Sequence, residues 1–222
     1  AYGNRKPDKA FARVTGVSFR DFMTLELADA VIEERGKFYI TNFSKVYLYN
    51  DLLSGIFDYT VRPGTKETLA ASARRIRSAG KRAGRYAYLF DSLAALTDLV
   101  ADKCDFGVRA RKAYKEGDRD ALKALADEIP RLIRKLDKFY AAYKAQWERD
   151  SRPWGFQVQD VRLGGLKQRM LHCREILLDY LDGGRSIPEL ETEILPAYEY
   201  NPEVKPNFIY NSWGGTVTAN VL

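Results

Sequence analysis

Cysteine and histidine are scarce in this chain, which has two cysteines and one histidine among 222 residues. Cys104 and Cys173 do not make a disulfide framework or a zinc site, so we interpret both as buried thiols on the apolar faces of helices. His172 precedes Cys173, and neighbouring residues of a helix point to different faces, which argues against a catalytic Cys/His pair. We expect no metal and no cofactor.

Long apolar runs and familiar catalytic motifs are also missing. No run approaches the roughly 20 apolar residues that a membrane helix needs, and no signal-peptide pattern opens the chain. A Gly-rich phosphate loop, HExxH, a nucleophile elbow and CxxC are absent. The opening "AYGNRKPDKAFARVTG" resembles the interior of a longer polypeptide, so we expect a fragment. Because buried thiols suit a reducing compartment, we expect a cytoplasmic protein.

Basic residues, by contrast, outnumber acidic ones by 36 to 30, for a net charge of +6. The excess lies in "RRIRSAGKRAGR", residues 74–85, which holds six basic residues and no acid. Such a cluster can bind phosphates or an acidic polymer. The simpler alternative is a basic helix C-terminus that complements the helix dipole, followed by a glycine-containing break.

The main pattern is that of amphipathic helices. Apolar residues recur at spacings of three and four in four long segments: 65–79, 82–115, 118–148, and the stretch from Asp160 to Gly183. Shorter helices are expected at 8–15, 18–34 and 51–58. Pro130 should bend its helix without ending it, because the apolar stripe continues in phase. We predict a mainly α fold, a bundle of long antiparallel helices.

The C-terminal segment "ILPAYEYNPEVKPNFIYNSWGGTVTANVL" differs from these helices. It contains three prolines, and Gly214–Gly215 separates "FIYNSW" from "TVTANVL". This composition predicts a short extended or β-hairpin tail.

Two acidic groups are candidates for chemistry. Asp98, Asp102 and Asp105 recur on one helix face, where three carboxylates can ligate a hard cation. Asp127–Glu128 is an adjacent acidic pair in the middle of a helix. In both cases a charged, solvated helix face is the simpler interpretation.

The segment "SRPWGFQVQDVRLGGLKQRM", residues 151–170, leads from a Pro/Gly loop into a helix. Asp160 stands where an N-cap belongs. Gly164–Gly165 cost about 1 kcal/mol each relative to alanine, so we expect a close approach there by a neighbouring helix or a ligand. Arg162 either pairs with Asp160 or projects toward a partner. The candidate substrate or interface residues are Trp154, Asp160, Arg162 and Trp213.

Three strings, "SKVYLYNDLLSGIFD", "GFQVQDVRLGGLKQRMLHCREILLDYLDG" and "YNSWGGTVTANVL", carry a family resemblance. In this order they resemble the C-terminal helical region of bacterial family 20 glycoside hydrolases of the exo-β-N-acetylglucosaminidase type, across roughly residues 42–222. Such β-N-acetylhexosaminidases have an α/β N-terminal domain, a catalytic (β/α)8 barrel and a helical C-terminal domain.

The resemblance implies a role without catalysis. Family 20 enzymes remove terminal N-acetylhexosamines by substrate-assisted catalysis, with an adjacent Asp-Glu pair on the barrel. That motif is absent here, and Asp127–Glu128 is no substitute. The implied domains are 1–41, a linker of short helices from an upstream barrel, and 42–222, the helical domain. The implied partners are that barrel and a second copy of the enzyme. An N-acetylhexosaminide would bind only to the intact enzyme, and we expect no nucleic acid or membrane.

Two alternatives remain open. An independent helical module could bind nucleic acid or an acidic protein through residues 74–85, with an affinity that falls steeply with salt. A carbohydrate-binding domain could act through the 14 tyrosines and three tryptophans, because aromatic rings stack on sugars.

Overall fold

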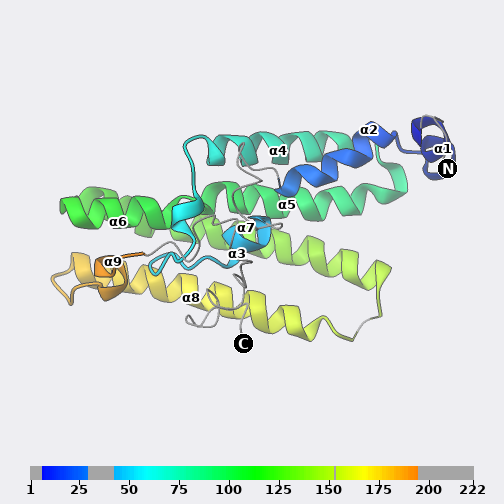
Figure 1. Ribbon diagram of the computed structural model, residues 1–222. Coiled ribbons are helices and arrows are strands. Elements are labelled where there is room, and N and C mark those ends of the chain that lie inside the picture. The colour runs from blue at the N-terminus through cyan, green and yellow to red at the C-terminus, as the bar shows by residue number, and fades with distance from the viewer. Residues whose placement is uncertain (1–6, 30–42, 153, 195–222) are drawn as a thin grey trace, which may run out of the picture.

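A computed structural model describes residues 7–29, 43–152 and 154–194, and all regular structure within these ranges is helical (Figure 1). The elements are α1 Pro7–Thr15, α2 Phe19–Phe22, the 3-10 helix η1 Met23–Asp29, α3 Phe43–Tyr49, η2 Asp58–Thr60, α4 Thr65–Gly80, η3 Gly84–Tyr86, α5 Ala87–Lys103, α6 Phe106–Glu116, α7 Arg119–Asp150, α8 Gln157–Leu181 and α9 Pro188–Glu191. The expected extended or β-hairpin tail lies outside the described residues.

Four long helices form the body of the molecule. In the order α4, α5, α7 and α8, each packs against the next, and successive helices run in opposite directions (Figure 1). The predicted mainly α bundle of antiparallel helices is therefore confirmed. No helix in the described part of the chain is long and apolar enough to cross a membrane.

Helix α7 supplies the centre of the core. Its buried residues recur at spacings of three and four, so they form one stripe that faces α5 and α8: Leu122, Leu125, Ile129, Leu132 and Leu136. Each such burial contributes about 1.5–3 kcal/mol. The helix begins as expected, because the Asp118 carboxylate accepts a hydrogen bond from the Ala121 N–H at 2.9 Å. Pro130 lies inside the helix, as predicted.

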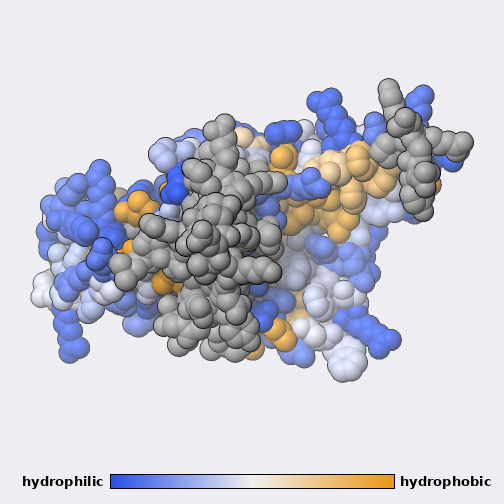
Figure 2. All heavy atoms as spheres, viewed as in Figure 1, coloured by the Kyte–Doolittle hydropathy of each residue, from blue (hydrophilic) through white to orange (hydrophobic). Residues whose placement is uncertain are grey.

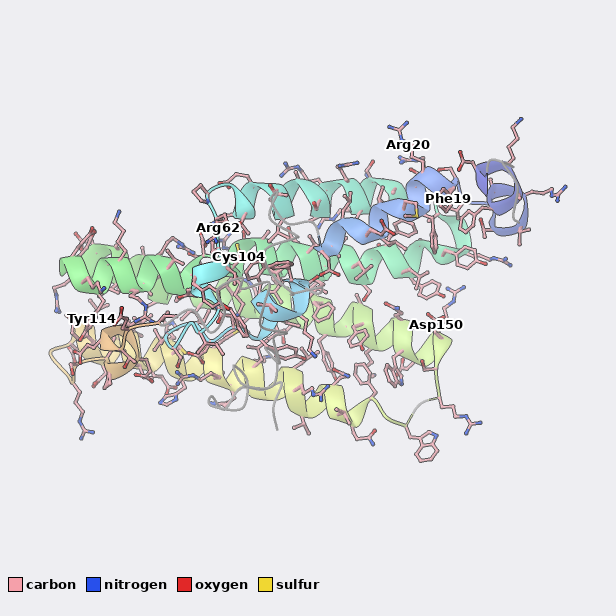
Figure 3. The ribbon with its side chains drawn as sticks, viewed as in Figure 1. Phe19, Arg20, Arg62, Cys104, Tyr114 and Asp150 are labelled. Carbon is pink, nitrogen blue, oxygen red and sulfur yellow. The ribbon has the colours of Figure 1, made fainter. Side chains whose placement is uncertain are left out.

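The prediction of a single helix over 82–115 is wrong. The structure has the short η3, then α5, a turn at Cys104–Asp105, and α6. The apolar pattern could not reveal the break, because Phe106 and Ala110 of α6 are buried as fully as Leu99 of α5. Figure 3 shows Cys104 at this break.

The prediction of a helix at 51–58 is also wrong. The helix here is α3, and it ends at Tyr49. The Asp51 carboxylate accepts hydrogen bonds from the N–H groups of Leu53 and Ser54, both at 2.9 Å, which favours a turn over a helix. A single helix is also expected at 18–34. In the described part of this segment, the structure has the short helix α2 followed by the 3-10 helix η1.

The N-terminal elements pack on one side of the bundle. Val17 and Ala28 share a small apolar cluster with Ile76 of α4 and Phe90 of α5. Hydrophobic surface gathers over α2, η1 and the start of α5 on the face seen in Figure 2. Residues 7–29, which fall within the expected linker 1–41, thus contact α4 and α5.

Candidate functional site

The start of α8 differs from the sequence-based expectation. The helix begins at Gln157, so Asp160 lies in its first turn, and the prediction that Asp160 caps the helix is wrong. The Gln157 side chain instead accepts a hydrogen bond from the Gly155 N–H at 2.6 Å, which allows an earlier start. The Asp160 carboxylate accepts a hydrogen bond from the Tyr140 hydroxyl at 2.7 Å and so joins α8 to α7.

The close approach expected at Gly164–Gly165 is not seen at Gly164. This residue is exposed, and a Cβ atom added to it would meet nothing within 4 Å. Gly164 lines a hollow of about 290 Å³, together with Asp160 and Tyr140.

Trp154 is the most exposed aromatic residue near α8, with 74% of its surface accessible. Val158 and Val161 are 44% and 58% exposed, and their spacing of three places both on one face of α8, whereas Trp154 lies in the turn before the helix. We name Trp154, Val158 and Val161 the α8 apolar strip. Phe156 points the other way, with its ring 5.6 Å from that of Tyr143. Trp213 lies outside the described residues.

Arg162 lines a different hollow, a cavity of about 390 Å³ where η1, α3, α5, α7 and α8 meet. We name it the Arg162 cavity. Its apolar wall consists of leucines, with Phe139 beside them: Leu25, Leu48, Leu89, Leu93, Leu96 and Leu163. Arg162 makes no ion pair with Asp160, because residues two apart lie on opposite sides of a helix. The expected alternative in which Arg162 projects toward a partner stays a prediction.

The three aspartates on α5 and the following turn are ion-paired. Asp98 and Asp102 both face Lys135 of α7, with Asp98 Oδ2 3.0 Å from its Nζ. Asp105 faces Arg109 at 3.1 Å. This favours the charged helix face over a cation site. No group of three or more His, Cys, Asp or Glu side chains within the described ranges could hold a metal ion.

Asp127 and Glu128 are paired as well. Glu128 accepts two hydrogen bonds from the Arg109 guanidinium, at 2.9 and 3.2 Å, and Asp127 pairs with Lys123. Both carboxylates therefore form ion pairs with basic side chains at the surface of α7, as expected for a charged helix face.

The basic segment 74–85 forms the second half of α4 and the following turn. Arg82 donates a hydrogen bond to Asp21 of α2 at 3.0 Å, and Arg77 lies 3.9 Å from Asp98. Arg74 and Arg75 are exposed, with no ion pair to any residue that the structure describes. Part of this charge thus holds the fold together.

A buried polar cluster escaped the sequence analysis. The Asp58 carboxylate accepts a hydrogen bond from Asn50 Nδ2 at 2.7 Å, while its second oxygen has no partner among the described residues. Burial raises the pKa of Asp58 to about 7. Lys103 is enclosed nearby and donates to the carbonyls of Tyr47, at 3.0 Å, and Asn50. Burial lowers the pKa of Lys103 to about 8, against the charges of Asp51 and Asp58.

One signal could have revealed this cluster. Lys103 follows Leu99 and Val100 by four and three residues, which places its side chain on the buried face of α5. No comparable signal marks Asp58, because its surroundings come from segments far apart in the chain.

The thiols are not poised for chemistry. Cys104 and Cys173 are free and buried, as predicted, and burial raises the pKa of each to about 12. His172 is exposed on another face of α8, so a Cys/His pair does not form.

Comparison with protein families finds a match over most of the chain. Residues 20–209, most of the chain, match the family described as Glycoside Hydrolase 20C C-terminal domain. A comparison with curated proteins finds no match.

Proposed function

Because the chain belongs to the Glycoside Hydrolase 20C C-terminal domain family, we propose that it is the non-catalytic helical domain of a bacterial enzyme that removes terminal N-acetylhexosamines. The family match carries this proposal. The ion pairs of Asp127 and Glu128 support the non-catalytic role, because neither carboxylate is free to orient or protonate a substrate. The two buried thiols suit a reducing compartment, so we place the enzyme in the cytoplasm.

Within that enzyme, the domain packs on the catalytic barrel. The hydrophobic surface over α2, η1 and the start of α5 supports this contact, because it adjoins the first described elements of the domain (Figure 2). The α8 apolar strip is a second surface, and we assign it to contact between two copies of the enzyme. Trp154 suits this role, because exposed tryptophans commonly anchor interfaces. Trp213 remains a candidate for the same contacts.

Activity assays test the first part of the proposal. This chain alone should not hydrolyse p-nitrophenyl N-acetylglucosaminide, whereas a longer polypeptide that includes the upstream barrel should. Hydrolysis by the chain alone would refute the non-catalytic role.

Self-association of the longer enzyme tests the second part. Trp154→Ala combined with Val161→Ser should raise the dimer dissociation constant at least about tenfold, measured by analytical ultracentrifugation. Val108→Ser is the matched control, because Val108 is an exposed valine on α6 outside the strip. Asp160→Ala and Arg162→Ala extend the comparison. If rate, substrate affinity and dimerisation survive all these changes, the residues of this loop and helix are structural only.

A further inference from the structure

The Arg162 cavity has the size and shape of a small-molecule site. Its volume of about 390 Å³ falls within the usual range for ligand pockets, roughly 300–1,000 Å³. Residues of five elements line it and leave one side open, so its walls are held by the helices of the bundle. Leu25, Leu89 and Leu93 line the cavity and also pack against the N-terminal apolar cluster.

One side of the cavity is polar and has unused hydrogen-bonding capacity. Within the described residues, Arg162 makes no ion pair or hydrogen bond, and neither do the side-chain amides of Gln146 and Gln159. The phenols of Tyr49 and Tyr143 line the same side and lie within the field of Arg162. Burial raises the pKa of both phenols, so each hydroxyl remains a donor at neutral pH.

The charge of this lining is of one sign. Among the residues that the structure describes, the wall holds the cations Arg162 and Lys45 and no Asp or Glu, and the site depends on Arg162. The hollow beside Gly164, by contrast, is lined by Asp137 and Asp160 together with Lys167. A guanidinium in a cavity with apolar walls favours an anion that can accept two parallel hydrogen bonds.

We propose that the Arg162 cavity binds a small organic anion with an apolar body, such as an aliphatic carboxylate. The carboxylate lies on the Arg162 guanidinium and accepts hydrogen bonds from the phenols of Tyr49 and Tyr143. The apolar body lies against the leucines of α5 and η1. The site adjoins the surface assigned to the barrel contact, because leucines of η1 and α5 belong to both, and it uses none of the residues of the α8 apolar strip. The proposal depends on neither contact.

Isothermal titration calorimetry with octanoate tests the proposal directly. Octanoate should bind one site per chain, with a dissociation constant on the order of 0.1–1 mM. 1-Octanol and octylammonium have the same apolar body without the negative charge, and both should bind at least about tenfold more weakly.

Two substitutions locate the site. Arg162→Gln should weaken octanoate binding about tenfold, and Tyr143→Phe should weaken it severalfold. Arg74→Gln is the matched control, because it removes the same charge from an exposed site on α4 and should leave binding unchanged. Circular dichroism checks that each variant keeps its helical content. Non-saturating binding, equal binding of 1-octanol, or wild-type affinity in folded Arg162→Gln would each overturn the proposal.

Discussion

At the scale of single residues, Asp58 is a carboxylic acid enclosed between two glycines. Cβ atoms added to Gly55 and Gly107 would lie only 2.1 and 2.2 Å from Asp58 Oδ2. Since burial raises the pKa of Asp58 from 3.8 to about 7, the folded protein holds a proton that the unfolded chain releases between these values. Folding is therefore linked to pH in this window.

The free energy of unfolding should fall by about 4 kcal/mol from pH 4 to pH 8 on account of Asp58. The free energy of unfolding falls with rising pH because the pKa is raised in the folded protein. Stability is greatest at low pH, where the carboxyl is protonated in both the folded and the unfolded state. Asp58→Asn keeps an acceptor for Asn50 and should flatten this dependence. Urea denaturation at several pH values measures it.

Asp91→Asn is the matched control, because Asp91 lies on the exposed side of α5. This variant should keep the wild-type slope. Burial tends to raise the pKa of Asp51, but the salt bridge with Arg169 outweighs burial and lowers it, so Asp51 affects stability only below about pH 4. A wild-type protein whose stability does not fall between pH 4 and pH 8 would contradict the buried, neutral Asp58.

At the scale of elements, two helical glycines predict opposite responses to alanine. Gly164→Ala in α8 should raise the free energy of unfolding by about 1 kcal/mol, because the new methyl meets nothing and alanine favours the helix. Gly107→Ala in α6 should lower it by about 2 kcal/mol, because the methyl would overlap the enclosed Asp58 carboxylate.

Thermal unfolding of both variants tests this pair. For a chain of this size, each kcal/mol corresponds to a shift of about 2–4 °C in Tm. A rise in Tm for both variants would show that helix propensity alone decides, and that the contact between α6 and Asp58 contributes little.

At the scale of the whole molecule, Arg111 of α6 joins segments that are far apart in the chain. Its guanidinium donates hydrogen bonds to the carbonyls of Leu53, at 3.1 Å, and Leu190, at 2.9 Å. Tyr114, one turn later, bonds Glu191 at 2.7 Å and accepts the Ile187 N–H, where α6 meets α9 (Figure 3). At the other end of the bundle, Tyr88 donates to Asp150 at 2.6 Å.

Arg111→Met should therefore release α9 from the bundle. Hydrogen exchange at residues 188–192 should speed up at least about tenfold, because buried carbonyls lose a charged donor, while α4 and α5 stay protected. Lys112→Met, on the exposed side of the same helix, should change neither region. Equal acceleration throughout the chain would mean that Arg111 supports global rather than local stability.

Much of this architecture follows from local sequence patterns. The stripe from Leu122 to Leu136, the cap at Asp118 and the glycine at 117 each act within a few residues, so the bounds of α7 were predictable. The same holds for the buried thiols. The break between α5 and α6 was not predictable, because both helices bury apolar residues in compatible phase.

The sequence alone determined the helical class, the antiparallel bundle and the resemblance to a family, because helical periodicity and caps depend on residues close together in the chain. Tertiary structure alone decided which way each polar group of the sites faces. It turned Asp160 toward Tyr140 and Arg162 into a cavity lined by five elements, and it enclosed Asp58 between Gly55 and Gly107. These environments arise where distant segments meet, and no local pattern records that meeting.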